Sequence, residues 1–415
     1  MSVKKFAALL AVLVAALLLV FSVGAAQDEL SAQEKLELVG EFLYFDENLS
    51  EPAGQSCASC HTPEFGFVDP DKGKPVSEGV IPGLFGGRNS PASAYAMYAP
   101  IRYKDAIEGL WIGGQFWDSR AAGDTLGDPL ADQALGPFLN PVEMANPDMA
   151  TVIRDVAASE YAELFKEVWK IENFDNVEAA YDQVALSIAA FERTALFGQF
   201  SSKYDYYLQQ CLAMGGGKDD CAQGTGDEAM IAGAVFSKKE WEGFQLFMGF
   251  NDNDGILAEG EGAFCVACHV VDWTADTGNV IVPVWSPDGS VPPLFTDFTY
   301  DNLGVPKSDH KLLAGADVDL GLGPVVGDSD EDGKFKVMTL RNIAQTSPYA
   351  HNGFFKKLED ITHFYNTRDV VEEGWPGPEV PETINTDELG NLGLSDTDEA
   401  ALVKFMKTLS DGWMP

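Results

Sequence analysis

The chain has 415 residues, and its 65 Asp and Glu against 27 Lys and Arg give a formal charge of −38 at pH 7. This excess of negative charge repels nucleic acids and anionic membranes, so it excludes them as partners and favours a basic or neutral one. A hydrophobic content of 46% with 11% aromatic residues is sufficient for packed cores, which excludes a disordered chain.

Residues 1–26 carry the pattern of a secretory signal peptide. Lys4 and Lys5 precede an apolar run at 6–23, and small residues at 24–26 form a cleavage site. We therefore expect export to the periplasm, no membrane span after cleavage, and a charge of −40 once both lysines are removed from the −38 total. An uncleaved membrane anchor is the alternative, because the run is long for a signal peptide.

Four of the six cysteines lie in two C-x-x-C-H frames. The first frame is Cys57, Cys60 and His61, and the second frame is Cys265, Cys268 and His269. Two thiols at this spacing add across the vinyl groups of one haem, and the adjacent His becomes the proximal ligand of the iron. A redox dithiol or half a zinc site fits a single frame, but two frames behind a signal peptide favour two covalent c-type haems.

The remaining cysteines, Cys211 and Cys221, flank a glycine-rich polar loop. In an oxidising compartment we expect a local disulfide that braces this loop. Two free thiols are the alternative.

The predicted elements are mainly helices. Apolar residues recur at helical spacing within 148–170, 177–197 and 241–250. Ser395, with Asp398 three residues later, forms a capping box that begins a final helix through Leu409. Sustained period-two alternation is absent, and the Gly- and Pro-rich stretches 63–91, 274–293 and 374–393 are predicted loops.

The spacing of the two frames suggests the domain organisation. They lie 208 residues apart (265 minus 57), which suits one haem in each of two domains. We expect an N-terminal haem domain at 27–200 and a C-terminal haem domain at 201–415, whose last helix is free to pack back on the first domain. The predicted fold class is mainly α, with two cytochrome c-like domains and long irregular loops.

A haem with an open sixth position activates peroxide, whereas a haem closed by a second strong ligand carries electrons. Besides the two proximal histidines only His310, His351 and His363 remain, and none lies between His61 and Asn140. We therefore expect the N-terminal haem to be high-spin and accessible as isolated.

Breaking the O–O bond of peroxide needs a group that moves a proton from the near oxygen to the leaving one. Glu143 is the candidate for this acid/base role, and Gln133 is the candidate for orienting peroxide by a hydrogen bond. Taken without context, Glu143 fits a solvated carboxylate better, and Gln133 has a weaker signal still.

Several motifs, taken together and in order, resemble the bacterial di-haem cytochrome c peroxidase and MauG superfamily. They are the stretches 116–120, 133–144, 335–342, 348–353 and 364–366. The resemblance covers nearly the whole mature chain and implies that the N-terminal haem is the peroxide site and the C-terminal haem its electron-transfer partner. It also implies that Pro137 lines the distal pocket with Glu143 and Gln133.

The resemblance further implies Trp117 as an electron relay between the haems, with a buried core tryptophan as the alternative. It also implies one calcium ion between the domains, held at Asn89, Thr346 and Pro348, and oxygen ligands there suit this hard cation.

The distal ligand of the second haem separates the branches of this superfamily, since peroxidases use Met and the MauG branch uses Tyr. The matching position is Tyr365, whose phenolate would stabilise higher oxidation states of the iron. His363 and Met338 are the rivals. Residues two apart on a helix point about 200° apart, so only one of Tyr365 and His363 faces the haem.

We therefore expect a periplasmic di-haem oxidoreductase that reacts with hydrogen peroxide and draws electrons from a basic protein donor, a small cytochrome c or a cupredoxin. One alternative is a MauG-like oxidase that modifies residues of a protein substrate, for which Trp273 is the nearest surface relay. The other is a purely electron-transferring di-haem cytochrome. The oligomeric state stays open, a homodimer included.

Overall fold

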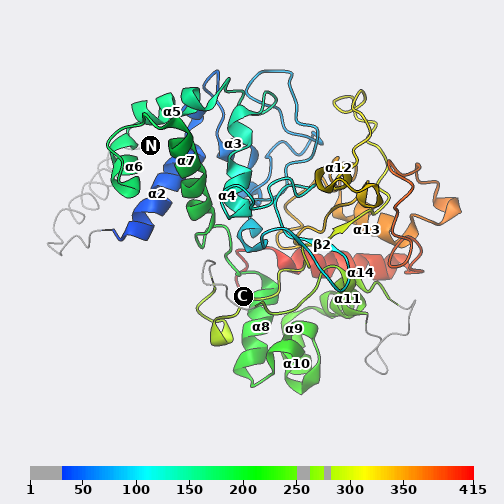
Figure 1. Ribbon diagram of the computed structural model, residues 1–415. Helices are drawn as coiled ribbons and strands as arrows, with labels where there is room; N and C mark the ends of the chain where they lie inside the picture. Colours follow the sequence, from blue (N-terminus) through cyan, green and yellow to red (C-terminus); the bar gives the residue numbers. More distant parts are fainter. Residues whose placement is uncertain (1–29, 250–261, 275–281) are drawn as a thin grey trace, which may run out of the picture. The chain divides into compact units, whose positions relative to one another are not determined.

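The computed structural model describes residues 30–249, 262–274 and 282–415 (Figure 1). The chain divides into two compact units, Met1–Lys35 and Leu36–Pro415, and the second unit contains both frames. The predicted signal peptide lies outside the described residues. Within the described ranges, no helix is long and apolar enough to cross a membrane.

The fold is mainly helical, as predicted. The helices of eight or more residues are α2 (Ala32–Phe45), α5 (Met149–Ala158), α6 (Ala162–Trp169), α7 (Val177–Glu192), α8 (Lys203–Ala213), α11 (Lys238–Met248), α13 (Leu358–Thr367) and α14 (Asp396–Met406). The shorter helices are α3 (Cys57–Cys60), α4 (Pro129–Ala134), α9 (Lys218–Gln223), α10 (Gly226–Ala232) and α12 (Gly323–Val326). Two antiparallel pairs of short strands complete it, β1 (Tyr103–Lys104) with β2 (Trp111–Ile112) and β3 (Tyr300–Asp301) with β4 (Phe335–Lys336).

The predicted helices form, with one difference. The stretch 148–170 is two helices rather than one, because Ser159 adopts an extended backbone after α5 and its hydroxyl bonds to the Val156 carbonyl. The final helix begins as predicted, since Ser395 and Asp398 form a complete capping box at α14.

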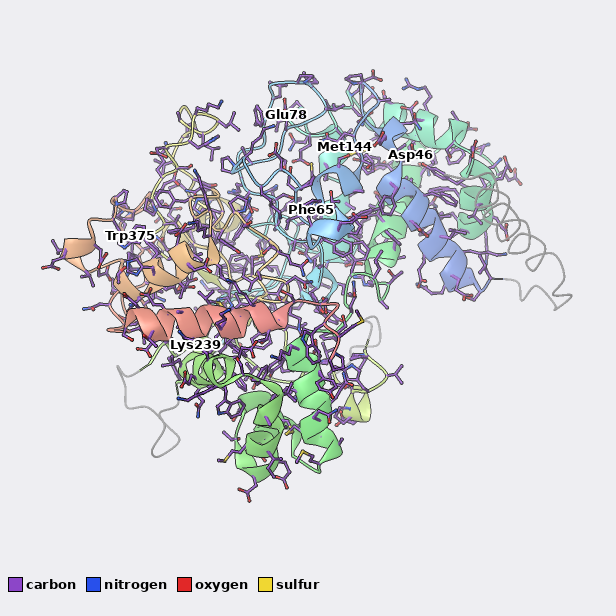
Figure 2. The ribbon with its side chains drawn as sticks, turned by 180° about the vertical axis from the view of Figure 1, so that it is seen from behind. Asp46, Phe65, Glu78, Met144, Lys239 and Trp375 are labelled. Carbon is purple, nitrogen blue, oxygen red and sulfur yellow. A yellow bond between two sulfur atoms is a disulfide. The ribbon has the colours of Figure 1, made fainter. Side chains whose placement is uncertain are left out.

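Two main hydrophobic cores lie in the unit Leu36–Pro415. The first is formed largely within 39–200, from α2, α4, α5, α6 and α7. The second is formed within 204–409, where α14 packs along α11 and the rings of Phe244 and Phe405 stack at 4.7 Å. Figure 2 shows this pair from behind, with Lys239 marking α11 beside the long α14. The haem domains predicted at 27–200 and 201–415 stay a prediction.

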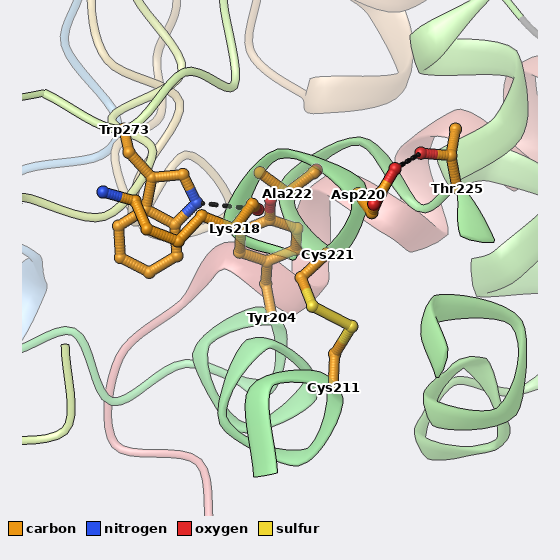
Figure 3. The surroundings of a disulfide bond; sticks show 8 residues. All are labelled: Tyr204, Cys211, Lys218, Asp220, Cys221, Ala222, Thr225 and Trp273. Carbon is orange, nitrogen blue, oxygen red and sulfur yellow. Dashed lines mark hydrogen bonds between the residues drawn. A yellow bond between two sulfur atoms is a disulfide. The ribbon is translucent and has the colours of Figure 1, made fainter. Parts of the chain in front are cut away.

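The predicted disulfide between Cys211 and Cys221 forms. It differs from the expected loop brace, because Cys221 lies on α9 and the bond joins this helix to α8 (Figure 3). The hydroxyl of Tyr204 on α8 also donates to the Ala222 carbonyl, at 2.8 Å. The disulfide therefore fastens two helices to each other.

Candidate functional site

The first frame is positioned by α3 and the loop that follows it. Cys57 and Cys60 are the end residues of α3, and His61 caps it. The His61 Nδ1 atom lies 3.2 Å from the Phe67 carbonyl oxygen. A ring N–H that donates there leaves Nε2 as a lone-pair ligand for iron. Burial lowers the pKa of His61, which favours the neutral imidazole that a metal requires.

The second frame has the same arrangement. The His269 Nδ1 atom lies 2.9 Å from the Phe295 carbonyl oxygen, so Nε2 is again the atom left for the metal. Cys265 and Cys268 are unpaired and line a large cavity with His269, here called the second-haem cavity. Each frame thus offers two free thiols and one oriented imidazole, which fits a covalent c-type haem.

The environment of the thiols argues against a redox dithiol. Burial raises the pKa of Cys60, Cys265 and Cys268 to about 12. Thiol–disulfide catalysts depend on the opposite shift, because the thiolate is the reactive species. The frames are therefore better suited to permanent attachment of a group than to disulfide exchange.

Tyr365 lies on α13 and lines the second-haem cavity. His363 does not line it. Its Nδ1 atom lies 2.9 Å from Glu399 Oε1 and its Nε2 atom 3.3 Å from Glu373 Oε2. With both ring nitrogens held by carboxylates, His363 is a poor candidate for an iron ligand.

Met338 also lines the second-haem cavity. Its backbone carbonyl acts on the His269 imidazole together with that of Phe295, so Met338 lies on the side of the proximal histidine. The geometry therefore favours Tyr365 over both rivals as the candidate distal ligand.

Glu143 lies beside the first frame. Its charge acts on both Cys57 and Cys60, and Asn140 Nδ2 donates to its Oε1 atom at 2.5 Å. Burial raises the pKa of the carboxyl, and the positive charge of Arg120 opposes the shift. A half-buried carboxyl with a raised pKa next to the predicted peroxide site suits an acid/base group.

Gln133 and Pro137 belong to the same compact segment as Glu143. The Met144 N–H donates to the Pro137 carbonyl at 3.3 Å, and the Gly136 N–H donates to the Gln133 carbonyl at 3.1 Å. The Gln133 side chain is half-buried and makes no hydrogen bond within the described part of the chain, which leaves its amide available to a small polar ligand.

Trp117 and the predicted calcium ligands are among the residues that line the second-haem cavity. The Trp117 Nε1–H donates to the Asn89 carbonyl at 2.8 Å, and Thr346 and Pro348 line the cavity beside them. The Asn89 Nδ2 atom donates to the Pro75 carbonyl at 3.1 Å, so its Oδ1 atom is the one left for a hard cation.

The sequence did not indicate three charged residues of the second-haem cavity. Lys336 is buried and donates to the carbonyls of Gly113 and Gly114, and burial lowers its pKa to about 7. Its position between two apolar residues of a recognised motif was the available signal. Asp301 and Glu388 also line the cavity, and no sequence pattern links them.

Two oriented imidazoles, two pairs of free thiols and a large cavity at the second frame, in a mainly helical fold, define a di-haem c-type protein. Comparison with known proteins agrees. A family profile described as di-haem cytochrome c peroxidase matches residues 33–212. The methylamine utilization protein MauG of Paracoccus denitrificans is 34% identical over 417 residues, covering 95% of this chain and 93% of that protein.

Two further relatives are more distant. The cytochrome c551 peroxidase of Nitrosomonas europaea is 27% identical, covering 90% of this chain and 79% of that protein. The crystal structure of the di-haem peroxidase BthA from Burkholderia thailandensis matches with a TM-score of 0.72 at 26% identity, covering 93% of this chain and 90% of that one. The chain belongs to the di-haem cytochrome c peroxidase and MauG family and is an enzyme of that class, with two haems.

Proposed function

We propose that the protein reacts with hydrogen peroxide at the haem of the first frame and takes the electrons from a partner protein through the haem of the second frame. The position of Glu143 beside Cys57 and Cys60, with its pKa raised by burial, is the observation that carries this proposal. When bound, the first haem supplies the iron at which the O–O bond breaks. Glu143 takes the proton from the near oxygen of peroxide and returns it to the far oxygen, which leaves as water.

Trp117 is the proposed relay for electrons between the two sites. Its indole N–H is held by the Asn89 backbone carbonyl, which is not basic enough to take a proton. Trp117 can therefore lose and regain an electron while keeping its own proton, so its redox step needs no proton acceptor.

The proposal also covers the donor protein, the cellular compartment and a calcium ion. The charge of −38 favours a basic donor protein, and the apolar segment at 6–23 directs the chain to the periplasm. A calcium ion at Asn89, Thr346 and Pro348 would fix the loops next to Trp117.

Oxidation of residues in a protein substrate is the second candidate function, and the place of Tyr365 in the second-haem cavity favours it. A phenolate ligand would favour stored oxidising equivalents over easy reduction. Trp273 is the candidate surface relay. It is half-buried, its ring lies 6.3 Å from that of Trp285, and Lys218 Nζ lies 5.4 Å above it.

Stopped-flow mixing of the ferric protein with peroxide tests the role of Glu143. We expect Glu143→Gln to react about 100-fold or more slowly than the wild type, because a well-placed acid/base group contributes on the order of 100-fold to 10,000-fold. Glu64→Gln is the matched control, since it removes an exposed carboxylate near the same frame. A wild-type rate in Glu143→Gln would show that this carboxyl does not move the proton.

A further inference from the structure

Two carboxylates lie against one attachment thiol of the second frame. The Cys268 Sγ atom, one carboxylate oxygen of Asp301 and one of Glu388 all lie within 4.8 Å of one another. All three residues line the second-haem cavity. Once Cys268 is bonded to haem, both carboxylates lie at the edge of the macrocycle.

A single amide holds this pair. The Asn385 Nδ2 atom donates to Asp301 Oδ2 at 2.7 Å and also to Glu388 Oε2. The Asn385 Oδ1 atom accepts from the backbone N–H groups of Asp387 and Glu388, which shapes the turn that carries Glu388. The Asn385 N–H donates to the Asn302 carbonyl and fastens this turn to the residue after β3. The two carboxylates are therefore placed by the fold.

Burial raises the pKa of Asp301, and its hydrogen bonds act in the opposite direction, toward the charged form. Asp301 accepts from the Asn302 N–H at 2.8 Å as well as from Asn385, and every donor to the pair is a neutral N–H group, which needs an acceptor oxygen. Asp297 adds a third negative charge that acts on Cys268. Lys334 is a positive group that acts on Asp301, and its Nζ atom lies 2.9 Å from Glu331 Oε2.

We propose that Asp301 and Glu388 tune the second haem toward its oxidised states, so that it stores oxidising equivalents and resists early reduction by a donor. Every electron that the iron loses adds one positive charge, and a fixed negative charge nearby stabilises the product of that loss by Coulomb attraction. The partly enclosed cavity screens this attraction less than bulk water does. The role deepens the second candidate function, oxidation of a protein substrate, and rests on it for its biological meaning, since a Tyr365 ligand and the carboxylate pair would act in the same direction.

Spectroelectrochemical titration of the purified di-haem protein tests this role, because it resolves the two haems and measures a potential rather than turnover. We expect the midpoint potential of the second haem to rise in Asp301→Asn and in Glu388→Gln, and to rise most in the double variant. The first haem serves as the internal reference and should keep its potential. Asp387→Asn is the matched control, because it removes a carboxylate from the same exposed turn without touching Cys268.

Asp301→Asn could disturb folding, because Asp301 is half-buried. Glu388 is exposed, so Glu388→Gln should fold normally, and it must still raise the midpoint potential of the second haem. An unchanged second potential in Glu388→Gln and in the double variant, with both haems attached, would overturn the proposal. Equal shifts in Asp387→Asn would do the same. The reaction with peroxide is tested by a different measurement. A ferric first haem that does not react with peroxide would contradict the proposed function, but it would leave this test unaffected, because the potentials are measured without peroxide.

Discussion

The Glu143 carboxyl is governed by two opposing influences that other residues control. Burial raises its pKa, while Arg120 and the Asn140 amide favour the charged form. Arg120 is itself held in place, because its guanidinium contacts both oxygens of Asp118 and lies 3.7 Å above the Phe116 ring. Arg120 therefore acts indirectly, because its positive charge stabilises the charged form of the Glu143 carboxyl and opposes the rise in its pKa.

This balance predicts a shift in the pH profile. Glu143 must be deprotonated to take a proton from peroxide, so the reaction rate falls as the pH drops through its pKa. Replacing Arg120 by Gln removes the charge that lowers the pKa, so the pKa rises further and the fall in rate moves to higher pH. Stopped-flow rates between pH 5 and 9 measure this. A fall at the same pH in both proteins, or at a lower pH in Arg120→Gln, would contradict the assignment.

Site residues that lie close together in the sequence could be predicted from their spacing. Site residues that only tertiary folding brings together could not. The C-x-x-C-H spacing specifies both thiols and the imidazole because one helical turn brings them to one haem. Asp301 and Glu388 are 33 and 120 residues beyond Cys268 (301 − 268 and 388 − 268), and only tertiary packing brings them to that thiol. The sequence also gives no sign that Glu373 and Glu399 hold the ring of His363.

At the scale of elements, capping and periodicity were reliable, and so were the loops predicted at 63–91 and 374–393, which hold no α-helix or strand. The Ser395 capping box and the apolar face of α14 follow from local spacing, and the structure confirms them. The break between α5 and α6 follows from the extended backbone of Ser159, and β1 pairs with β2 as a local hairpin, whereas β3 pairs with β4 across more than thirty residues. The glycines at 215–217 and the charged residues at 218–220 predict a loop, but the structure has the helix α9 from Lys218.

The disulfide between α8 and α9 predicts a separable effect on stability. Removing it by the double substitution Cys211→Ser and Cys221→Ser should lower the free energy of unfolding by about 2–3 kcal/mol, since it closes a short loop. Thermal unfolding with and without a reductant measures this, and the reductant should destabilise the wild type only. The reaction with peroxide should keep its rate in the variant, because both cysteines lie in the second core and outside the second-haem cavity.

On the scale of the whole molecule, Arg341 connects the two main cores. It is fully buried, and its Nη1 atom lies 2.8 Å from Asp205 Oδ2, also fully buried. The guanidinium also contacts the rings of Tyr95 and Phe200 from the first core. Asp411, beyond α14, accepts from the Tyr95 hydroxyl. The last residues of the chain thus contact the first core, while α14 itself packs on α11 and α13.

This junction predicts a large loss of stability from a small substitution. Asp205→Asn removes the carboxylate that pairs with the buried Arg341 and leaves it only the weaker influence of Asp411. It should cost about 3–5 kcal/mol of unfolding free energy, as breaking one half of a buried ion pair does. Glu359→Gln, which breaks an exposed pair with Lys407, is the control and should cost less than about 1 kcal/mol. Equal losses in chemical denaturation of the two variants would contradict the structural role of Arg341.

The central claim is that the first haem is open and the second is closed by Tyr365. Electron paramagnetic resonance of the ferric protein as isolated tests it most directly, because spin state reports the sixth ligand of each iron. The predicted spectrum holds one high-spin and one low-spin haem, and Tyr365→Phe converts or perturbs only the low-spin signal. Two low-spin haems in the wild type would contradict the claim and favour a protein that only transfers electrons.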